Sequence, residues 1–182
     1  MLILLVGVAI YSNSFQGPFV LDDRQSIVEN TDIRGLEAFH AGSTRYVGYL
    51  TFALNYRFGG LDVTGYHVVN LAIHLASALL VYALLHLTFR TPYFRGQESG
   101  AGGQKDRFES QTSNLDSNLA SLASLASWRF EPRTVLPLFA ALLFVVHPVQ
   151  TQAVTYVVQR LTSLCTLFYL LSMVLYAQAR LR

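Results

Sequence analysis

A run of 24 residues without Asp, Glu, Lys or Arg, from Tyr66 to Phe89, constrains the fold of this chain most strongly. As an α-helix it would measure about 36 Å, at roughly 1.5 Å per residue, and could cross a bilayer core of about 30 Å with some tilt. The lipid interior offers the backbone no hydrogen bonds, so a continuous apolar run favours a spanning helix, whereas barrel strands alternate in hydropathy. The sequence therefore predicts an all-α integral membrane protein.

Three further apolar runs accompany this one: Leu2 to Tyr11, Val135 to Val146 and Leu161 to Ala179. The first is short, and it must extend through Phe15 to approach the thickness of the bilayer core. A signal peptide is the alternative, but no Lys or Arg precedes this run and no small-x-small cleavage site follows it. The run from Val135 stops before His147-Pro148, because proline disfavours helix at the preceding residue. We therefore predict about four transmembrane helices.

Polar segments divide the predicted spans into two membrane units. The expected units are residues 1–89, with two spans and an acidic loop at 12–65, and residues 134–182, with two spans and a loop at 147–160. Within the first loop, Arg45 to Phe58 is aromatic and amphipathic but too short to cross, so we expect an interfacial helix there. Residues 90–133 contain many Gly, Ser and Asn residues, a composition that predicts a disordered linker.

The positive residues predict how the chain is oriented. Eight of the thirteen Lys and Arg residues lie in the linker and the C-terminal tail, and positive residues favour the cytoplasmic side. Both termini are then cytoplasmic and both loops extracytoplasmic. The loops would be periplasmic in a bacterial inner membrane and lumenal in an endoplasmic reticulum membrane. The net charge of +2 is too small to indicate a nucleic-acid partner.

This orientation places three polar clusters on one membrane face. They are Asp22-Asp23; Arg45 with Asn55 and Tyr56; and the loop from His147 to Gln159-Arg160. A carboxylate beside arginines at a lipid surface suits a reaction of an anionic lipid. Arg45 and Arg160 would hold a phosphate, and an aspartate would accept a proton from the attacking hydroxyl.

The same residues also have structural interpretations. Asp22 followed by Gln25 fits a capping box, which is the favoured interpretation of this pair taken alone. Arginines near a membrane often extend toward lipid headgroups. The polar residues on one face of the long span are His67, Asn70, His74 and Ser77. Such a face suits a metal site or a proton path, although hydrogen bonding between helices is its commoner use.

Four segments, in chain order, carry a resemblance to a known family. They are F-V-L-D-D at Phe19 to Asp23, T-F-A-L-N-Y at Thr51 to Tyr56, G-Y-H-V-V-N-L-A-I-H at Gly65 to His74, and L-F-V-V-H-P-V-Q-T-Q-A-V-T-Y-V-V-Q-R at Leu143 to Arg160. Together they resemble the N-terminal membrane portion of the transmembrane and tetratricopeptide-repeat O-mannosyltransferases and their bacterial relatives. The last segment, Leu143 to Arg160, is the most specific of the four and is called the histidine–proline string below.

The resemblance implies part of a C-type glycosyltransferase fold, in which an acid of the first extracytoplasmic loop, here Asp22 or Asp23, is essential. A sugar would pass from a polyprenyl-phosphate lipid to a Ser or Thr hydroxyl of an acceptor protein. Members of the family often carry Glu where this chain has Gln152, so a metal site is not supported and the cofactor requirement stays open. The family has further spans and helical repeats, so we expect the chain to be the N-terminal part of a larger enzyme.

Two functions without this chemistry stay open as alternatives. One is a four-span scaffold whose polar residues only pack helices together. The other is one half of a transporter, with His67, Asn70 and His74 along its path. Further spans and 34-residue repeats encoded after Arg182 would favour the enzyme.

Overall fold

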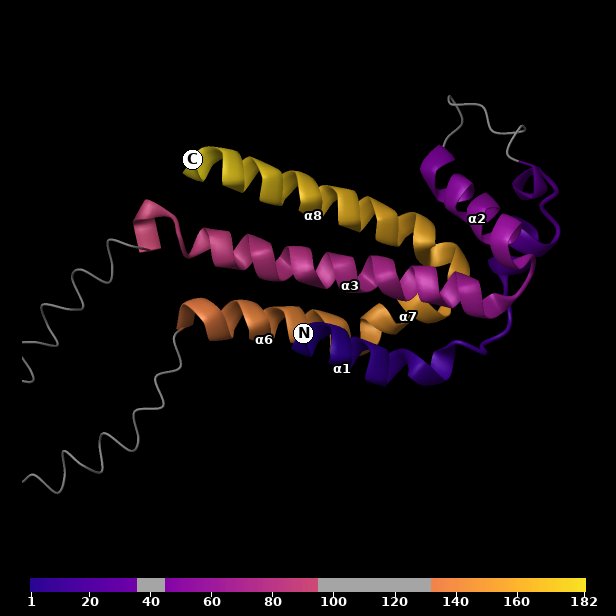
Figure 1. Ribbon diagram of the computed structural model, residues 1–182, viewed down its shortest axis with the longest axis horizontal. Coiled ribbons are helices and arrows are strands. Elements are labelled where there is room, and N and C mark those ends of the chain that lie inside the picture. Colours follow the sequence, from indigo (N-terminus) through magenta and orange to yellow (C-terminus); the bar gives the residue numbers. More distant parts are fainter. Residues whose placement is uncertain (36–44, 95–131) are drawn as a thin grey trace, which may run out of the picture.

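The computed structural model describes residues 1–35, 45–94 and 132–182, and over these ranges the chain forms helices and turns without a strand (Figure 1). The α-helices are α1 (Leu2–Tyr11), α2 (Tyr46–Gly59), α3 (Val63–Thr88), α6 (Pro132–Val146), α7 (Thr151–Thr155) and α8 (Arg160–Leu181). Short helical turns occur at Ser12–Ser14, Arg24–Val28, Asp32–Arg34, Pro148–Gln150 and Val157–Gln159. The predicted all-α class is confirmed for the described part of the chain.

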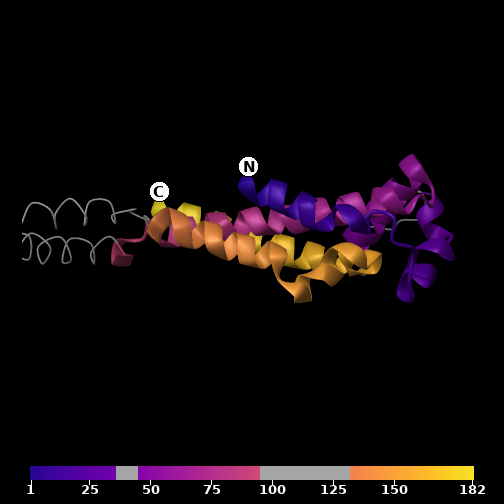
Figure 2. The same cartoon turned by 90° about the horizontal axis from the view of Figure 1, so that it is seen from below.

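Helix α3 forms the centre of the bundle. Helix α8 runs along one side of α3, and α6 and α1 run along the other (Figures 1 and 2). Gly7 lets α1 approach α3 closely, because a Cβ atom at this position would overlap the side chain of Leu75. The hydroxyl of Tyr11 donates a hydrogen bond to the carbonyl of Val145, 3.1 Å away, and so fastens the end of α1 to α6. A buried apolar core joins these helices and α7; it comprises Ile3, Tyr11, Leu71, Leu75, Ala78, Ala141, Val145 and Val154.

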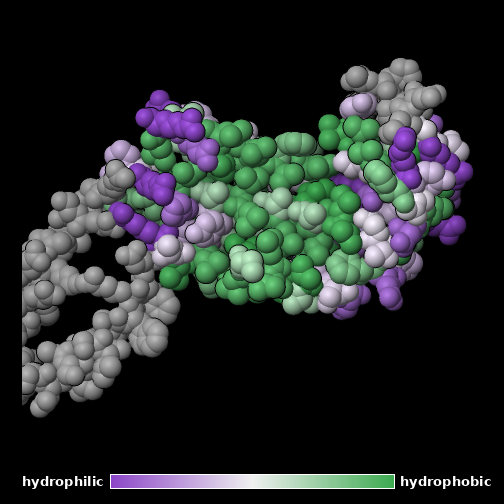
Figure 3. Space-filling model, viewed as in Figure 1, coloured by the Kyte–Doolittle hydropathy of each residue, from purple (hydrophilic) through white to green (hydrophobic). Residues whose placement is uncertain are grey.

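Apolar side chains cover the middle of the bundle, and polar side chains gather at its two ends (Figure 3). By length and composition, α3 and the segment Val157–Leu181 can each cross a membrane. The segments Arg133–Val146 and Pro148–Thr155 meet these criteria only together, as a pair bent by 54°, and the apolar helix Leu2–Ser14 is shorter. The described residues thus contain two spans, or three with the bent pair, where the sequence predicted about four. The two numbers of spans differ because the first apolar run is short and because a proline follows the end of α6. The sequence had indicated both features.

One polar end of the bundle carries the described parts of both predicted loops. Helices α3 and α8 begin at this end, α1 and α6 finish toward it, and α2 lies there close to the predicted limits of the interfacial helix (Figure 1). A second apolar cluster holds the end together; its buried members are Ile27, Ile33, Phe52, Ala53, Tyr66 and Val157. The opposite end carries the last turns of α3 and α8. Most of the predicted linker, residues 95–131, lies outside the described residues.

Candidate functional site

An open cavity of about 580 Å³ lies at the polar end, between the first loop and the beginnings of α2 and α8. Its charged lining residues are Asp22 and Arg45, and its polar ones include Gln25, Gln159 and Thr162. Residues from three distant parts of the sequence therefore share one cavity. Three of the residues that the sequence singled out, Asp22, Arg45 and Gln159, are among them.

Asp22 is exposed to this cavity and is held by a residue that the sequence analysis missed. Its backbone N–H donates a hydrogen bond to the hydroxyl of Tyr156, 3.2 Å away. The pKa of the Tyr156 phenol is raised, chiefly by desolvation and further by the nearby carboxylates of Asp22 and Asp23. The phenol is therefore neutral beside Asp22. Tyr156 stands within the histidine–proline string, which is the signal that could have identified it.

The neighbouring carboxylate of Asp23 is buried, and both its oxygen atoms accept hydrogen bonds from backbone amides. Its Oδ1 atom accepts a hydrogen bond from the amide of Val158 at 2.7 Å, and its Oδ2 atom accepts one from the amide of Val20 at 3.1 Å. Asp23 thus ties the first loop to the turn that precedes α8. The capping box suggested by Asp22 and Gln25 is not formed, because the helical turn begins after Asp23 and has no side-chain cap.

Arg160, for which the sequence predicted a phosphate contact, is fully buried. Its Nε atom donates to Oδ1 of Asn70 at 2.7 Å, its Nη1 atom to Oδ1 of Asn55 at 2.6 Å, and its Nη2 atom to the carbonyl of Tyr66 at 2.8 Å. The guanidinium carbon lies 4.7 Å from the ring centroid of Phe52. A phosphate at Arg160 would have to displace these acceptors, so the geometry gives this arginine, and with it Asn55 and Asn70, a role in joining α2, α3 and α8.

The polar face of α3 is also occupied by hydrogen bonds between segments. Both ring nitrogens of buried His67 face backbone carbonyls, Nδ1 that of Val154 at 3.1 Å and Nε2 that of Gly17 at 3.0 Å. The Nε2 atom of His74 lies 3.5 Å from the carbonyl of Val145. Hydrogen bonding between segments, the commoner interpretation of this face, is what the structure contains. In the described ranges, no three His, Cys, Asp or Glu residues are grouped as a metal ion would require.

The remaining predicted residues lie apart from the cavity lining. Nδ1 of exposed His147 accepts a hydrogen bond from the amide of Val149 at 3.3 Å, so this side chain caps the turn after α6. The ring of Tyr56 is covered by the guanidinium of Arg34, whose carbon is 5.9 Å from the ring centroid. Neither residue lines the cavity that contains Asp22.

An apolar groove of about 280 Å³ continues from the cavity between α2 and α8. Arg45 lines both spaces, and on the groove side its neighbours include Val47, Leu164 and Phe168. Gly48 allows α2 to lie against α8 here, because a Cβ atom on it would overlap the side chain of Leu161. The site thus combines a carboxylate, an arginine and an adjoining apolar surface, which is a combination suited to an amphipathic anion.

Comparison with known proteins gives relatives but no solved structure. No protein-family model matches the chain, and no solved structure does. The chain is 32% identical to Protein O-mannosyl-transferase TMTC4 of Homo sapiens, over 96% of this chain and 22% of the relative. It is 31% identical to Protein O-mannosyl-transferase Tmtc3 of Drosophila melanogaster, over 97% of this chain and 19% of the relative.

A third relative, Protein O-mannosyl-transferase tmtc2 of Xenopus laevis, is 29% identical over 94% of this chain and 18% of its own length. The chain therefore spans about a fifth of the length of the curated relatives it matches. The similarity covers 94% or more of this chain in each of the three comparisons. The sequence thus relates this chain, over almost its whole length, to the transmembrane and tetratricopeptide-repeat protein O-mannosyltransferases, the family that its motifs resemble.

Proposed function

We propose that this chain binds the lipid-linked donor of a protein O-glycosyltransferase and supplies the general base, Asp22. The observation that carries the proposal is that Asp22 and Arg45 line one open cavity, which continues from Arg45 into an apolar groove. A polyprenyl-phosphate sugar has three matching parts: an apolar chain, a phosphate and a polar sugar. The relatives are named as protein O-mannosyl-transferases, which supports a sugar donor and a protein acceptor.

Arg45 is the residue we assign to the donor phosphate. Its guanidinium can form paired, charge-assisted hydrogen bonds to phosphate oxygens. A phosphate there would direct the polyprenyl chain along the α2–α8 groove and the sugar toward Asp22. The backbone of Arg45 is left-handed, with φ 67°, a conformation that non-glycine residues adopt at a cost and that often occurs at functional sites.

The transfer step follows from these positions. The Ser or Thr hydroxyl of the acceptor gives its proton to the carboxylate of Asp22 as its oxygen bonds to C1 of the sugar. The bond between C1 and the phosphate oxygen breaks, and the phosphate leaves with the electron pair, stabilised by Arg45. Asp23 and Tyr156 hold the backbone around Asp22 and act as positioning residues.

The proposed topology places this chemistry outside the cytoplasm. Arg90, Arg180 and Arg182 line a cavity at the opposite end of the bundle from Asp22, and positive residues favour the cytoplasmic side. In this arrangement residues 1–89 and 134–182 form the membrane part of a C-type glycosyltransferase, in a bacterial inner membrane or an endoplasmic reticulum membrane. A transporter is less favoured, because the polar face of α3 is filled by protein hydrogen bonds.

The test is sugar transfer by the purified full-length protein from polyprenyl-phosphate mannose to an acceptor peptide. Asp22→Asn keeps the shape of the side chain but removes its basicity, so we expect the rate to fall by about 10²- to 10⁴-fold. Arg45→Gln should instead weaken donor binding by about tenfold or more, because a hydrogen bond to a charged group contributes about 1.5–3 kcal/mol.

The matched control is Arg57→Gln, which removes an exposed arginine of α2 that lines neither space. This variant should transfer sugar at the parental rate. A folded Asp22→Asn variant that also does so would exclude Asp22 as the base and would favour the scaffold alternative.

A further inference from the structure

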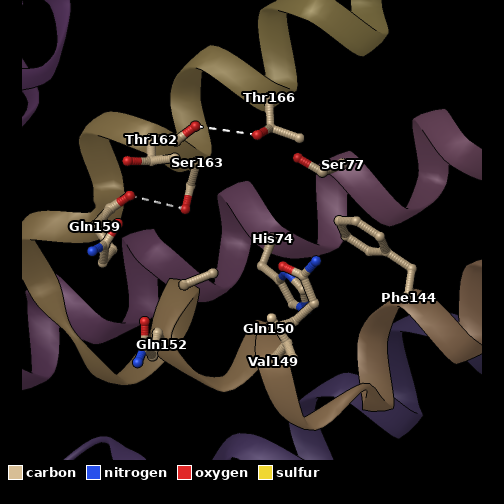
Figure 4. A pocket seen from close by; sticks show the side chains of 11 residues that line it. His74, Ser77, Phe144, Val149, Gln150, Gln152, Gln159, Thr162, Ser163 and Thr166 are labelled. Carbon is tan, nitrogen blue, oxygen red and sulfur yellow. Dashed lines mark hydrogen bonds between the residues drawn. The ribbon is translucent and has the colours of Figure 1, made fainter.

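A second pocket, of about 170 Å³, lies between α3, α8 and the bent segment after α6 and contains no charged residue in its lining. Figure 4 shows hydroxyl groups of α8 on one wall, Gln150 and Gln152 of the bent segment on another, and His74 and Ser77 of α3 between them. The pocket is therefore polar but uncharged. Such a lining inside the membrane-spanning part of a protein is costly unless its groups are satisfied.

The hydrogen bonds of the lining leave capacity for a ligand. Ser77, Ser163 and Thr166 each donate to a carbonyl four residues earlier in their own helix, at 3.0 to 3.2 Å, which leaves their hydroxyl oxygens free as acceptors. Within the described ranges, the side-chain amides of Gln150 and Gln152 have no hydrogen-bond partner, and each amide can both donate and accept. The pocket thus offers many neutral donors and acceptors and no charge, which suits a polyhydroxylated ligand.

The pocket adjoins the cavity that contains Asp22. Gln159 and Thr162 line both spaces, so they form the boundary between a charged compartment and an uncharged one. On the uncharged side, the ring of His74 stacks on that of Phe144, with centroids 5.1 Å apart, and provides a flat wall. The volume of the pocket is similar to that of an engineered cavity of about 150 Å³ that accommodates a six-membered ring.

We infer that this uncharged pocket is the binding site for the sugar ring of the donor. The inference rests on the proposed function, because it places the sugar of the same lipid whose phosphate lies at Arg45. The reacting C1 atom would then lie near Gln159 and Thr162, at the mouth of the pocket and within the cavity that Asp22 lines. Hydroxyls and amides on three walls would distinguish this sugar by its hydroxyl pattern, since a buried group left unpaired by the wrong sugar is costly.

The test compares two lipids that differ only in the sugar: polyprenyl-phosphate mannose and sugar-free polyprenyl phosphate. Binding of each is measured on the full-length protein in nanodiscs, for the parental protein and for Gln152→Leu and Thr166→Val. Each variant removes hydrogen-bonding groups from an exposed side chain of the pocket, so it should fold. We expect each to weaken binding of the mannose lipid by about 2- to 10-fold and to leave binding of the sugar-free lipid unchanged.

Ser172→Ala is the matched control, because it removes an α8 hydroxyl outside the pocket that donates to the carbonyl of Tyr169. It should bind both lipids as the parental protein does. Equal affinity of the parental protein for the two lipids, or unchanged mannose-lipid binding in both pocket variants, would overturn the sugar site and leave the phosphate proposal standing. Binding of neither lipid by the parental protein would overturn the proposed function, and the sugar site with it.

Discussion

The buried cluster around Arg160 and the open cavity around Arg45 lie at the same polar end of the bundle and use the same types of residue differently. In the Arg160 cluster, the guanidinium is enclosed by Asn55, Asn70 and the carbonyl of Tyr66. In the cavity, Arg45 is exposed and faces the same space as Asp22. An arginine near a membrane surface is thus available to a ligand only if the protein has not already supplied its acceptors.

The two adjacent aspartates show the same difference between a buried, hydrogen-bonded side chain and an exposed one. Asp23 is buried with both oxygens on backbone amides, and Asp22 is exposed in the cavity. We therefore expect substitutions in the first group, Arg160 and Asp23, to reduce stability. Substitutions in the second group, Asp22 and Arg45, should reduce activity or binding without affecting stability.

The largest expected effect on stability is that of Arg160→Met. It removes the hydrogen bonds of a charged donor, of which the three shortest go to Asn55, Asn70 and Tyr66. A hydrogen bond to a charged group contributes about 1.5–3 kcal/mol, so the loss should be on the order of 3 kcal/mol or more. The measurement is the thermal midpoint of unfolding of the detergent-solubilised protein, with Arg57→Met as the exposed control. If Arg160→Met keeps the parental midpoint but loses affinity for the lipid phosphate, Arg160 contacts the phosphate after all.

Asp23→Asn should come next, with a destabilisation of about 1–3 kcal/mol. An amide in this position presents only one acceptor oxygen to two backbone N–H groups, those of Val20 and Val158, and lacks the negative charge. Asp22→Asn is its natural control and should change stability by less than about 0.5 kcal/mol, because its carboxylate is exposed. Denaturant or thermal unfolding of the two variants is measured side by side, and a larger destabilisation by Asp22→Asn would mean that Asp23 is not the structural member of the pair.

Gly48→Ala tests the boundary between the cavity and the apolar groove. The added Cβ atom would overlap the side chain of Leu161, and such overpacking costs about 1–3 kcal/mol. Because Leu161 must then change its position and lines both the cavity and the groove, we also expect weaker binding of polyprenyl phosphate. At Gly59 an added Cβ atom would make only an ordinary contact, with Asp62, so Gly59→Ala should change neither stability nor lipid binding. Parental behaviour of both alanine variants would mean that the close contact between α2 and α8 is not needed.

Tyr156→Phe should have the smallest effect. It removes the acceptor of the Asp22 backbone N–H, a hydrogen bond that contributes about 0.5–1.5 kcal/mol. If the bond positions the base, kcat should fall by up to about tenfold while the KM for the donor and the thermal midpoint stay near the parental values. Tyr169→Phe, on the exposed face of α8, is the control. A change in KM alone would instead mean that Tyr156 contacts the donor.

Much of the fold follows from the sequence alone. The run from Leu2 to Tyr11 coincides with α1, the long uncharged run lies almost wholly within α3, and α6 ends at Val146 as the following His147-Pro148 predicts. These features depend on local properties, namely hydropathy over a window and the backbone restriction imposed by proline. The sequence also predicted one membrane face for Asp22, Arg45 and the loop that contains Gln159, because the positive residues predict a direction for each adjoining span.

The tertiary structure alone decided which of these residues are available for chemistry. The hydrogen bond that holds the backbone of Asp22 joins residues 134 positions apart, and the one from Val158 to Asp23 joins residues 135 positions apart. Arg45 directly precedes α2 and Arg160 is the first residue of α8, so both stand at the beginning of a helix, but only the packing of α2, α3 and α8 buries the second. Burial and the satisfaction of polar groups depend on contacts between distant segments, and local sequence patterns carry no information about those contacts.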